Sequence, residues 1–425
     1  EEGTWFFKLR VKAGSLGEAS LRFVASGGAF SSAVAESISL RPPMPYRVSL
    51  SSGKLLKGEK EVPLTRKTYP EFRKLSASVS YLPLGLSVGL LDYLEKYPYG
   101  CTEQILSKAF PVIALRGLGA GGDFKVGDKE SLAAFQVAQR VLAARQAEDG
   151  SFGLWSAKSD GPSFITAYAM HFLVEAYEAG LPVDKGLFQS GTEALKALAA
   201  GAGEGGTYTD PGSSAYAIYV LTRMGVVTTT NINALLGAKS LPKDWRKGPV
   251  GAWLSGAYAL MQQGSEATSL LSAAFAGKGR TADWHYSDLS SAAICLYMAS
   301  RHVPSLQASI AASALDSMAS LEAESRYNSL SSSYTILALA SYSRATAGMA
   351  QDKAGVEAKD AAGAWKALAL QGEGILRAEP SYGTTALRFS EKTARPLYWQ
   401  VVEAGFDTAL PAAAERHGLE VIREY

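Results

Sequence analysis

A long series of Ala-, Leu-, Ser- and Gly-rich segments occupies most of this chain, and it constrains the fold more than any other feature. From about residue 82 to residue 370, apolar residues recur at the spacing of one helix face. Helix pairs recur at roughly 40 to 50 residues, which indicates a repeated helical hairpin. Such repeats must stack or close on themselves to bury their apolar faces, so about six hairpins closing into a ring predict an α/α toroid. The clearest helical segments are 103–118, 131–147, 164–179, 188–200, 213–224, 250–263, 287–301, 305–321, 331–346 and 355–370.

Strand-like patterns flank the helical region on both sides. Before it, residues 5–12, 19–24 and 46–50 alternate between apolar and polar positions. After it, residues 384–389 and 397–403 have strand character. We therefore expect a multidomain α plus β protein, in which the helical region is inserted between two β segments that pair in one sheet.

Composition narrows the function classes. The 425 residues exceed one compact core, so two or three domains are expected. With 42 basic and 40 acidic residues and a net charge of +2, nothing favours a nucleic acid as partner. No apolar stretch has the length of a membrane span. Because both ends have strand character, we interpret the chain as a piece of a longer protein.

Cys101 and Gln104 form the candidate reactive pair. They end the octapeptide Tyr-Pro-Tyr-Gly-Cys-Thr-Glu-Gln, which begins at Tyr97 and precedes an apolar helical run. A helix that starts near Cys101 puts its thiol and the Gln104 amide on one face. A helix N-terminus also favours a thiolate, which can displace ammonia from the amide and leave an internal thioester. The alternative is that Cys101 is a small buried residue at a helix start. The second cysteine, Cys295, lies in an apolar helical run and is interpreted as core.

The whole octapeptide resembles the thioester motif of the alpha-2-macroglobulin family in its bacterial form. A second segment, Gln146 to Gly153, resembles a turn in the thioester domain of complement and macroglobulins, and also the repeat of terpene cyclases. We interpret Asp149-Gly150 as the turn itself, and Phe152 and Trp155 as side chains that pack between repeats.

The resemblance implies an α/α toroid inserted into a β-sandwich of the CUB type. Its implied order is the end of a macroglobulin-type β-sandwich at 1–30, the first part of the CUB-type domain at 31–80, the toroidal thioester domain at 81–370, the second part of the CUB-type domain at 371–417, and the start of a further β domain at 418–425.

The resemblance also implies a function. It suggests a broad-spectrum protease trap that rearranges when a protease cuts it and then links covalently to a protease lysine. Such a protein is a single-use inhibitor and not an enzyme, and it needs no cofactor or metal. Expected partners are proteases and the neighbouring macroglobulin-type domains of the same chain. The implied location is the periplasm, with an inner-membrane anchor outside this segment.

Several residues are candidates for a supporting role. Glu103 either is a first-turn carboxylate stabilised by the helix dipole, or orients Gln104 and shuttles a proton. Tyr97 and Tyr99 either shield the thioester from water or pack the turn. Because the β domain that helps to shield the thioester in the family only begins here, we expect Cys101 to lie in a partly open site.

Histidines give little support for other chemistry. Some complement-type proteins carry a histidine that attacks the thioester, and by position it would fall around Tyr208 to Pro211, where this sequence has none. We expect Tyr208 or Asp210 near the thioester instead, with direct attack by amines such as lysine. No histidine pair has metal-ligand spacing, and His171 on its apolar helix is expected to be a hydrogen-bonded core residue.

Two rival functions make different demands on the sequence. An α/α-toroid lyase, glycosidase or terpene cyclase would need paired carboxylates or an acidic motif, and the sequence shows no convincing pair. A scaffold without a thioester, in which Cys101 is purely structural, is the second rival.

Overall fold

The computed structural model describes residues 6, 8, 16–118, 127–158, 163–201, 210–277, 286–346, 354–372, 375–392 and 396–409. Tyr208, the segment 418–425 and nearly all of the strand expected at 5–12 lie outside these residues. The chain divides into two compact units. One unit comprises residues 1–47, 65–74 and 404–425, and the other comprises 48–64 and 75–403.

The first unit contains a long antiparallel hairpin. Strand β1 (Gly17–Gly27) pairs with β2 (Phe30–Leu40), and Phe23 lies opposite Val34. A short helix, η1 (Pro70–Phe72), also belongs to this unit. The second unit contains the helical region and two four-stranded sheets, and it carries the candidate site.

Helices alternate with short turns through the second unit. The described helices are η2 (Pro83–Leu86), α1 (Ser87–Lys96), α2 (Thr102–Leu115), α3 (Asp128–Arg145), α4 (Phe164–Glu178), α5 (Lys185–Ala200), α6 (Pro211–Arg223), α7 (Thr229–Leu236), η3 (Trp245–Lys247), α8 (Pro249–Leu260), α9 (Gly264–Ala276), α10 (Asp288–Arg301), η4 (Pro304–Leu306), α11 (Gln307–Ala323) and α12 (Ser329–Ala345).

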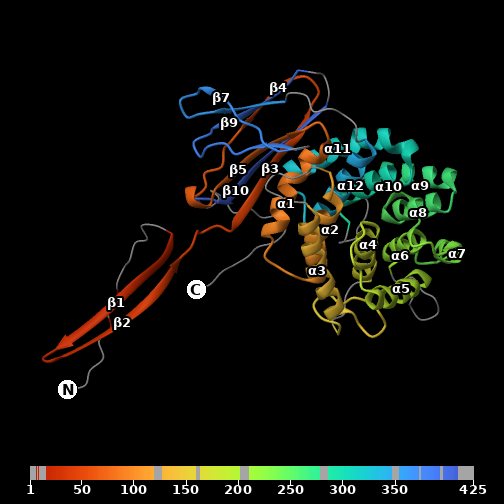
Figure 1. Ribbon diagram of the computed structural model, residues 1–425, viewed down its shortest axis with the longest axis horizontal. Helices are drawn as coiled ribbons and strands as arrows, with labels where there is room; N and C mark the ends of the chain where they lie inside the picture. The colour runs from red at the N-terminus through yellow and green to blue at the C-terminus, as the bar shows by residue number, and fades with distance from the viewer. Residues whose placement is uncertain are drawn as a thin grey trace. The chain divides into compact units, whose positions relative to one another are not determined.

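The even-numbered helices form a closed ring. Each of α2, α4, α6, α8 and α10 packs against the next, and α12 packs against α2 (Figure 1). These inner helices are buried on nearly all sides; in α4 every residue from Phe164 to Ala176 is buried. An outer helix such as α3 buries only one stripe, which includes Phe135 and Leu142. This difference explains why apolar residues surround the inner helices but line only one face of the outer ones.

Aromatic side chains fill the inside of the ring. Tyr168 on α4 lies 5.6 Å from Tyr334 on α12, and Trp253 on α8 lies 6.1 Å from the same Tyr334, each measured between ring centroids. Trp253 also stacks on Tyr216 of α6 at 3.9 Å. All four side chains are almost fully buried. Because helices that are not neighbours in the ring meet through these side chains, the ring has a packed interior.

Each sheet combines strands from before and after the helices. One sheet has the order β3-β10-β5-β8, and the other has the order β4-β9-β6-β7. The two flanks therefore pair with each other as expected, but in two sheets and not in the single sheet that was expected. The strands are β3 (Tyr46–Leu55), β4 (Gly58–Pro63), β5 (Lys74–Ser80), β6 (Gly355–Lys359), β7 (Trp365–Ala367), β8 (Leu376–Ala378), β9 (Ala386–Glu391) and β10 (Leu397–Phe406).

A single apolar cluster joins the two sheets. Alternate residues of β5 and β10, such as Val79 and Val401, contribute to it from one sheet. Val356 of β6 and Phe389 of β9 contribute from the other, and Phe389 stacks on Trp399 at 5.1 Å. Burial alternates along β6 and β9, as expected for strands with one face in this cluster, whereas β5 and β10 are buried along almost their whole length.

The expectation of a helix at 355–370 is wrong. This part of the range that was expected to be helical contains β structure. Residues 355–359 form β6, and Val356 and Ala358 point into the cluster between the sheets. The Ala-rich composition favoured a helix, but Asp360 accepts hydrogen bonds from the backbone of Ala362 and Ala364 and makes a turn toward β7. Tertiary packing and turn chemistry thus outweigh helix propensity here.

Buried polar contacts link the helical ring to the sheet. Gln400 on β10 accepts a 2.5 Å hydrogen bond from the backbone of Gly89 on α1. Its amide nitrogen donates to Leu86 and, at 2.9 Å, to Oε2 of Glu322 on α11. Glu322 is fully buried, and burial raises the pKa of its carboxyl well above the usual value. Burial therefore favours the neutral, protonated form of this carboxyl.

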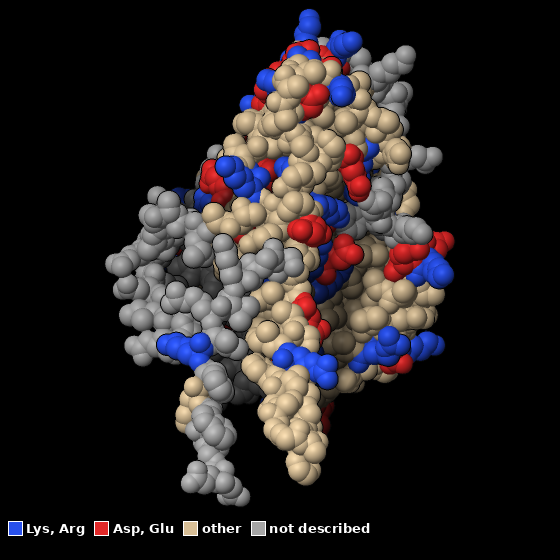
Figure 2. All heavy atoms as spheres, turned by 90° about the vertical axis from the view of Figure 1, so that its left-hand side faces the viewer, with Lys and Arg blue, Asp and Glu red and all other residues tan. Residues whose placement is uncertain are grey.

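Charges of both signs are intermixed on one face of the molecule. The described residues on the face shown in Figure 2 carry neighbouring Lys, Arg, Asp and Glu side chains, without a broad field of one sign. None of the described helices combines the length and the hydropathy that a membrane span requires.

Replacing Glu322 by Gln tests the buried carboxyl. The folded-state pKa lies above the unfolded value, so wild-type stability is complete below the unfolded pKa and falls as the pH rises toward the folded pKa. A glutamine side chain at position 322 does not ionise, so the variant does not lose stability as the pH rises in this way. We expect Glu322→Gln and wild type to be similar near pH 4, and the variant to gain on the order of 1 kcal/mol per pH unit above it.

Urea unfolding at several pH values measures this difference. Glu324→Gln, on the exposed end of the same segment, is the matched control for loss of a carboxylate. A Glu322→Gln variant that is less stable than wild type at pH 7 would contradict the assignment.

Candidate functional site

The candidate reactive pair lies at the start of an inner helix. Helix α2 begins at Thr102, so Cys101 is its N-cap residue and Gln104 is its third residue. The two form a capping box: the Cys101 side chain faces the Gln104 backbone N–H, and the Gln104 side chain returns to the Cys101 backbone. Pro98 and Gly100 end the preceding segment and allow the sharp entry into the helix.

The capping box sets the orientation of the Gln104 carboxamide. The backbone N–H of Cys101 donates to Oε1 of Gln104 at a distance of 3.0 Å. This hydrogen bond holds the carboxamide over the first turn, beside the cysteine side chain, and polarises its carbonyl group. A donor so placed stabilises negative charge on Oε1 if a nucleophile adds to the carboxamide carbon.

Thr102, which directly follows Cys101, anchors the site to the turn after α3. The backbone N–H of Thr102 donates to the Leu154 carbonyl at 2.9 Å, and its hydroxyl donates to Gly153 at 2.6 Å. The turn is the one predicted at Asp149-Gly150: Asp149 accepts from the Ser151 backbone, and Phe152 is buried. Trp155 is 57% exposed, so its expected packing between repeats is wrong.

Arg145 is a site residue that the sequence did not single out. It ends α3, and its guanidinium donates to the Gly100 carbonyl at 3.0 Å, to the Thr102 hydroxyl at 3.1 Å and to the Leu154 carbonyl at 3.2 Å. An arginine in the last turn of a helix usually indicates an interaction with the helix dipole. The sequence feature that could have indicated a role for Arg145 is its position directly before Gln146, where the turn segment begins.

Cys101 is more buried than expected. Its side chain is 5% exposed, so the expectation of a partly open site is wrong for the sulfur. Tyr97, Glu103 and Arg145 lie close enough to influence it electrostatically. Burial raises the pKa of the thiol, and Glu103 adds to this, while the backbone N–H of Gln104 and the charge of Arg145 lower it. The sulfur is thus largely removed from solvent, while groups that stabilise a thiolate lie close to it.

Glu103 connects α2 to α12. Oε1 accepts a 2.6 Å hydrogen bond from Ser107, and Oε2 accepts a 3.0 Å bond from Ser329, the first residue of α12. Ser107 in turn lies 3.0 Å from the hydroxyl of Tyr168, which donates to Ser333. Burial raises the pKa of the Glu103 carboxyl. These partners favour the structural interpretation, in which Glu103 ties the first turn of α2 to the ring.

The tyrosines occupy different positions. Tyr97 is half-buried and packs edge-on against Tyr93 at 5.5 Å and against Tyr99 at 5.8 Å. Tyr99 is 62% exposed. Burial raises the pKa of Tyr97, and Glu103 and the Cys101 thiol add to this. Of the two, Tyr97 is therefore the better candidate for shielding the sulfur.

Of the two residues expected in place of a histidine, the structure describes Asp210, which serves as a helix cap. Asp210 caps α6 by accepting from the backbone and the hydroxyl of Ser213. Tyr208 lies outside the described residues. His171 is confirmed as a core histidine: its ring nitrogens lie 2.7 Å from Tyr216 Oη and 3.1 Å from Tyr297 Oη. Burial lowers its pKa to about 4. In the part of the chain that the structure covers, no three His, Cys, Asp or Glu side chains gather in a way that could hold a metal ion.

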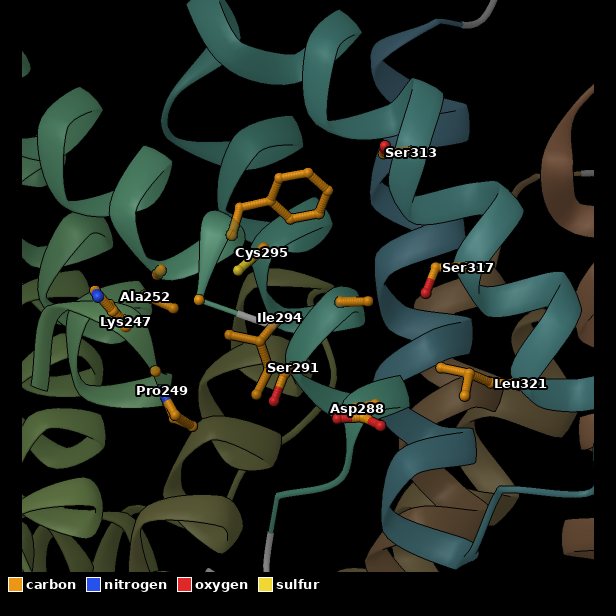
Figure 3. A pocket seen from close by; sticks show the side chains of 15 residues that line it. Lys247, Pro249, Ala252, Asp288, Ser291, Ile294, Cys295, Ser313, Ser317 and Leu321 are labelled. Atoms are coloured by element: carbon orange, nitrogen blue, oxygen red, sulfur yellow. The ribbon is translucent and has the colours of Figure 1, made fainter. Parts of the chain in front are cut away.

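A separate cavity contains the other cysteine. It has a volume of about 300 Å³ and lies between Lys247, Pro249 and Ala252 on one side and Ser313, Ser317 and Leu321 of α11 on the other, with Cys295 of α10 between them (Figure 3). No residue of the 97–104 motif lines it. Burial raises the pKa of Cys295 to about 12, so this thiol stays protonated and is a poor nucleophile.

Comparison with known proteins identifies the relatives. No family model matches the chain. An alpha-2-macroglobulin homolog from Yersinia pestis is 30% identical over 441 residues, which cover 99% of this chain and 21% of the relative. The alpha-2-macroglobulin of Pasteurella multocida is 29% identical and is matched over 96% of this chain and 23% of its own length. The chain belongs to the bacterial alpha-2-macroglobulin family. It spans about a fifth of the length of the curated alpha-2-macroglobulins that it matches.

Solved alpha-2-macroglobulin structures share the fold. The native Escherichia coli protein superposes with a TM-score of 0.69 at 20% identity, over 94% of this chain and 26% of the other. A Salmonella alpha-2-macroglobulin reacted with methylamine gives a TM-score of 0.69 at 21% identity, over 94% and 27%. The Escherichia coli protein activated by porcine elastase gives a lower TM-score of 0.50 at 20% identity, over 94% and 37%.

The turn that anchors the macroglobulin motif depends on Gly150. This glycine has a φ of +85°, and a Cβ there would lie 2.0 Å from the carbonyl oxygen of Ser190 on α5. Gly180 has a φ of +75°, and no atom lies within 4 Å of the corresponding position. Comparing alanine substitutions at these two glycines separates the free-energy cost of the left-handed backbone from the cost of the steric clash at position 150.

We expect Gly180→Ala to lower the free energy of unfolding by about 1–2 kcal/mol, the cost of a left-handed non-glycine residue. Gly150→Ala should lose roughly 1–3 kcal/mol more, because the turn must move away from α5. Urea unfolding measures both values, and equal losses would contradict the close approach of the turn to α5.

Proposed function

We propose that this chain is the thioester-bearing part of a protease inhibitor, and that Cys101 and Gln104 form the thioester. The observation that carries the proposal is the capping box of these two residues at the buried start of α2. Membership of the bacterial alpha-2-macroglobulin family supports it.

The chemistry begins with the Cys101 sulfur. As a thiolate it adds to the carboxamide carbon of Gln104, and Oε1 takes up the negative charge. The Cys101 backbone N–H, 3.0 Å from Oε1, stabilises this charge. Collapse of the adduct breaks the bond between the acyl carbon and the amide nitrogen, and this nitrogen leaves as ammonia after taking up the proton that the thiol lost. The result is a carbon–sulfur bond between the two side chains, with no change in oxidation state.

The stored bond then reacts with an amine. The nitrogen of a lysine adds to the acyl carbon, the thiolate leaves and takes the proton that the nitrogen loses, and a stable amide remains. Each molecule can do this once, so the proposed role is a single-use trap and not a turnover enzyme. The Salmonella relative reacted with methylamine and the Escherichia coli relative activated by elastase suggest amines and proteases as the reaction partners.

The rival functions are less well supported. A toroidal enzyme needs an accessible interior with acidic groups, whereas Tyr168, Trp253 and Tyr334 meet inside the ring. A purely structural Cys101 is the remaining rival, because a capping box by itself also stabilises a helix.

The proposal includes the architecture and the location. We infer that the closed helical ring is the toroidal thioester domain and that the two sheets are the CUB-type domain into which it is inserted. We further propose that the complete protein contains neighbouring macroglobulin-type domains. We propose that it acts in the periplasm and is held at the inner membrane by an anchor outside residues 1–425.

Methylamine uptake tests the pair directly. In the complete gene product that carries this chain, the intact mass should show loss of ammonia, and methylamine should then add once and release one thiol. Cys101→Ala and Gln104→Glu should both abolish methylamine uptake and the covalent adduct with trypsin or elastase, because each removes one partner of the bond.

Cys295→Ala is the matched control, since it removes the other buried thiol and should leave both reactions unchanged. Methylamine uptake that persists in Cys101→Ala would show that another residue is reactive. A wild-type mass without loss of ammonia would favour the structural role of Cys101.

A further inference from the structure

Arg145 contacts both residues that are adjacent to Cys101 in the sequence. One terminal nitrogen of its guanidinium donates to the carbonyl oxygen of Gly100, and the other donates to the hydroxyl of Thr102 and to the carbonyl of Leu154. The residue before the cysteine, the residue after it and the turn that follows α3 are therefore held by one side chain. The last residue of α3 is also tied to this turn through its own carbonyl, which accepts from the Gly153 backbone at 3.0 Å.

The hydrogen bond to Gly100 has a consequence for Cys101. The carbonyl of Gly100 and the N–H of Cys101 belong to the same planar peptide group and point in opposite directions. Fixing the Gly100 oxygen therefore fixes the direction of the Cys101 N–H. That N–H is the donor to Oε1 of Gln104. Rotation of this peptide group would move the donor away from the carboxamide.

We propose that Arg145 is a positioning residue of the thioester, which orients the Cys101 N–H toward the Gln104 carbonyl by holding the Gly100–Cys101 peptide group. This inference rests on the proposed function of the Cys101–Gln104 pair. Arg145 thus contributes to both proposed reactions. The same N–H stabilises Oε1 when the sulfur adds to the carboxamide and when an amine adds to the thioester.

The role requires an arginine. Gly100 and Leu154 offer carbonyl oxygens, which only accept hydrogen bonds, and the guanidinium offers several donors in a rigid plane. A lysine has one nitrogen on a flexible stem and cannot hold these separate acceptors in the same way. The charge of Arg145 also favours the thiolate, against the effects of burial and of Glu103 on the thiol pKa.

The test compares Arg145→Met, Arg145→Lys and Arg140→Met in the complete gene product. Arg140 lies on the exposed side of the same helix and is the matched control for loss of an arginine. Three quantities are measured: the fraction of molecules that have lost ammonia, the second-order rate constant for methylamine over a pH series, and the midpoint of thermal unfolding.

We expect Arg145→Met to reduce the methylamine rate constant by roughly 10- to 100-fold, less than the loss of a complete oxyanion donor. The fraction with a closed thioester should fall as well. Arg145→Lys should keep the thermal midpoint near the wild-type value but show at least a several-fold slower reaction. Arg140→Met should match wild type in all three quantities.

The results separate this inference from the proposed function. A wild-type protein without ammonia loss or methylamine uptake overturns the proposed function. A reactive wild type, with Arg145→Lys reacting at the wild-type rate at every pH, overturns the positioning role alone. If Arg145→Met does not fold, Arg145→Lys still decides, because a merely structural arginine would change the thermal midpoint and leave the rate constant of the folded molecules unchanged.

Discussion

Closure of the helical ring, where α12 packs against α2, is the constraint on which the rest of the second unit depends. A helical hairpin cannot bury its inner face alone, and only when the last helix meets the first does every inner helix have two neighbours. The closing contact carries polar groups as well as apolar ones, since Glu103 on α2 accepts a hydrogen bond from Ser329 on α12. The first turn of α2, which follows Cys101 directly, is therefore fixed by the step that completes the ring. Aromatic contacts across the interior, such as Tyr168 with Tyr334, reinforce it.

The sheets depend on the same closure. Because β3 and β5 precede the helices and β8 and β10 follow them, the first sheet is complete only after the ring has returned the chain to its starting point. Gln400 on β10 then bonds to α1 and to Glu322 of α11, so buried hydrogen bonds attach the sheet to helices near both ends of the helical region. Breaking one partner of such a contact leaves a buried polar group without compensation, which costs more than the contact itself contributes.

Periodicity in the sequence was sufficient to predict the helical region, its repeated hairpins and the pairing of the flanks, because burial on one face or on all faces leaves a direct record in residue spacing. It failed at residues 355–359, where the sheet that selects a strand over a helix is built from distant segments. At the site, the motif located Cys101 and Gln104. The burial of the sulfur was not predicted, nor was the role of Arg145, which depends on where α3 ends relative to the turn at Gly153 and Leu154. These are tertiary distances, and no local pattern encodes them.

The choice of residues at the helix start is itself an argument about function. Ser, Thr, Asp and Asn are the preferred N-cap residues because their oxygens accept hydrogen bonds well, and sulfur is a weaker acceptor. Other helices of this unit follow the rule: Asp184, Asp210, Ser287 and Asn328 cap α5, α6, α10 and α12. Helix α2 departs from it with Cys101, although the third position keeps the Gln that a capping box uses. The surrounding structure supports this departure through Arg145, Thr102 and Glu103. A departure from local preference is expected where chemistry, and not stability, determines the residue.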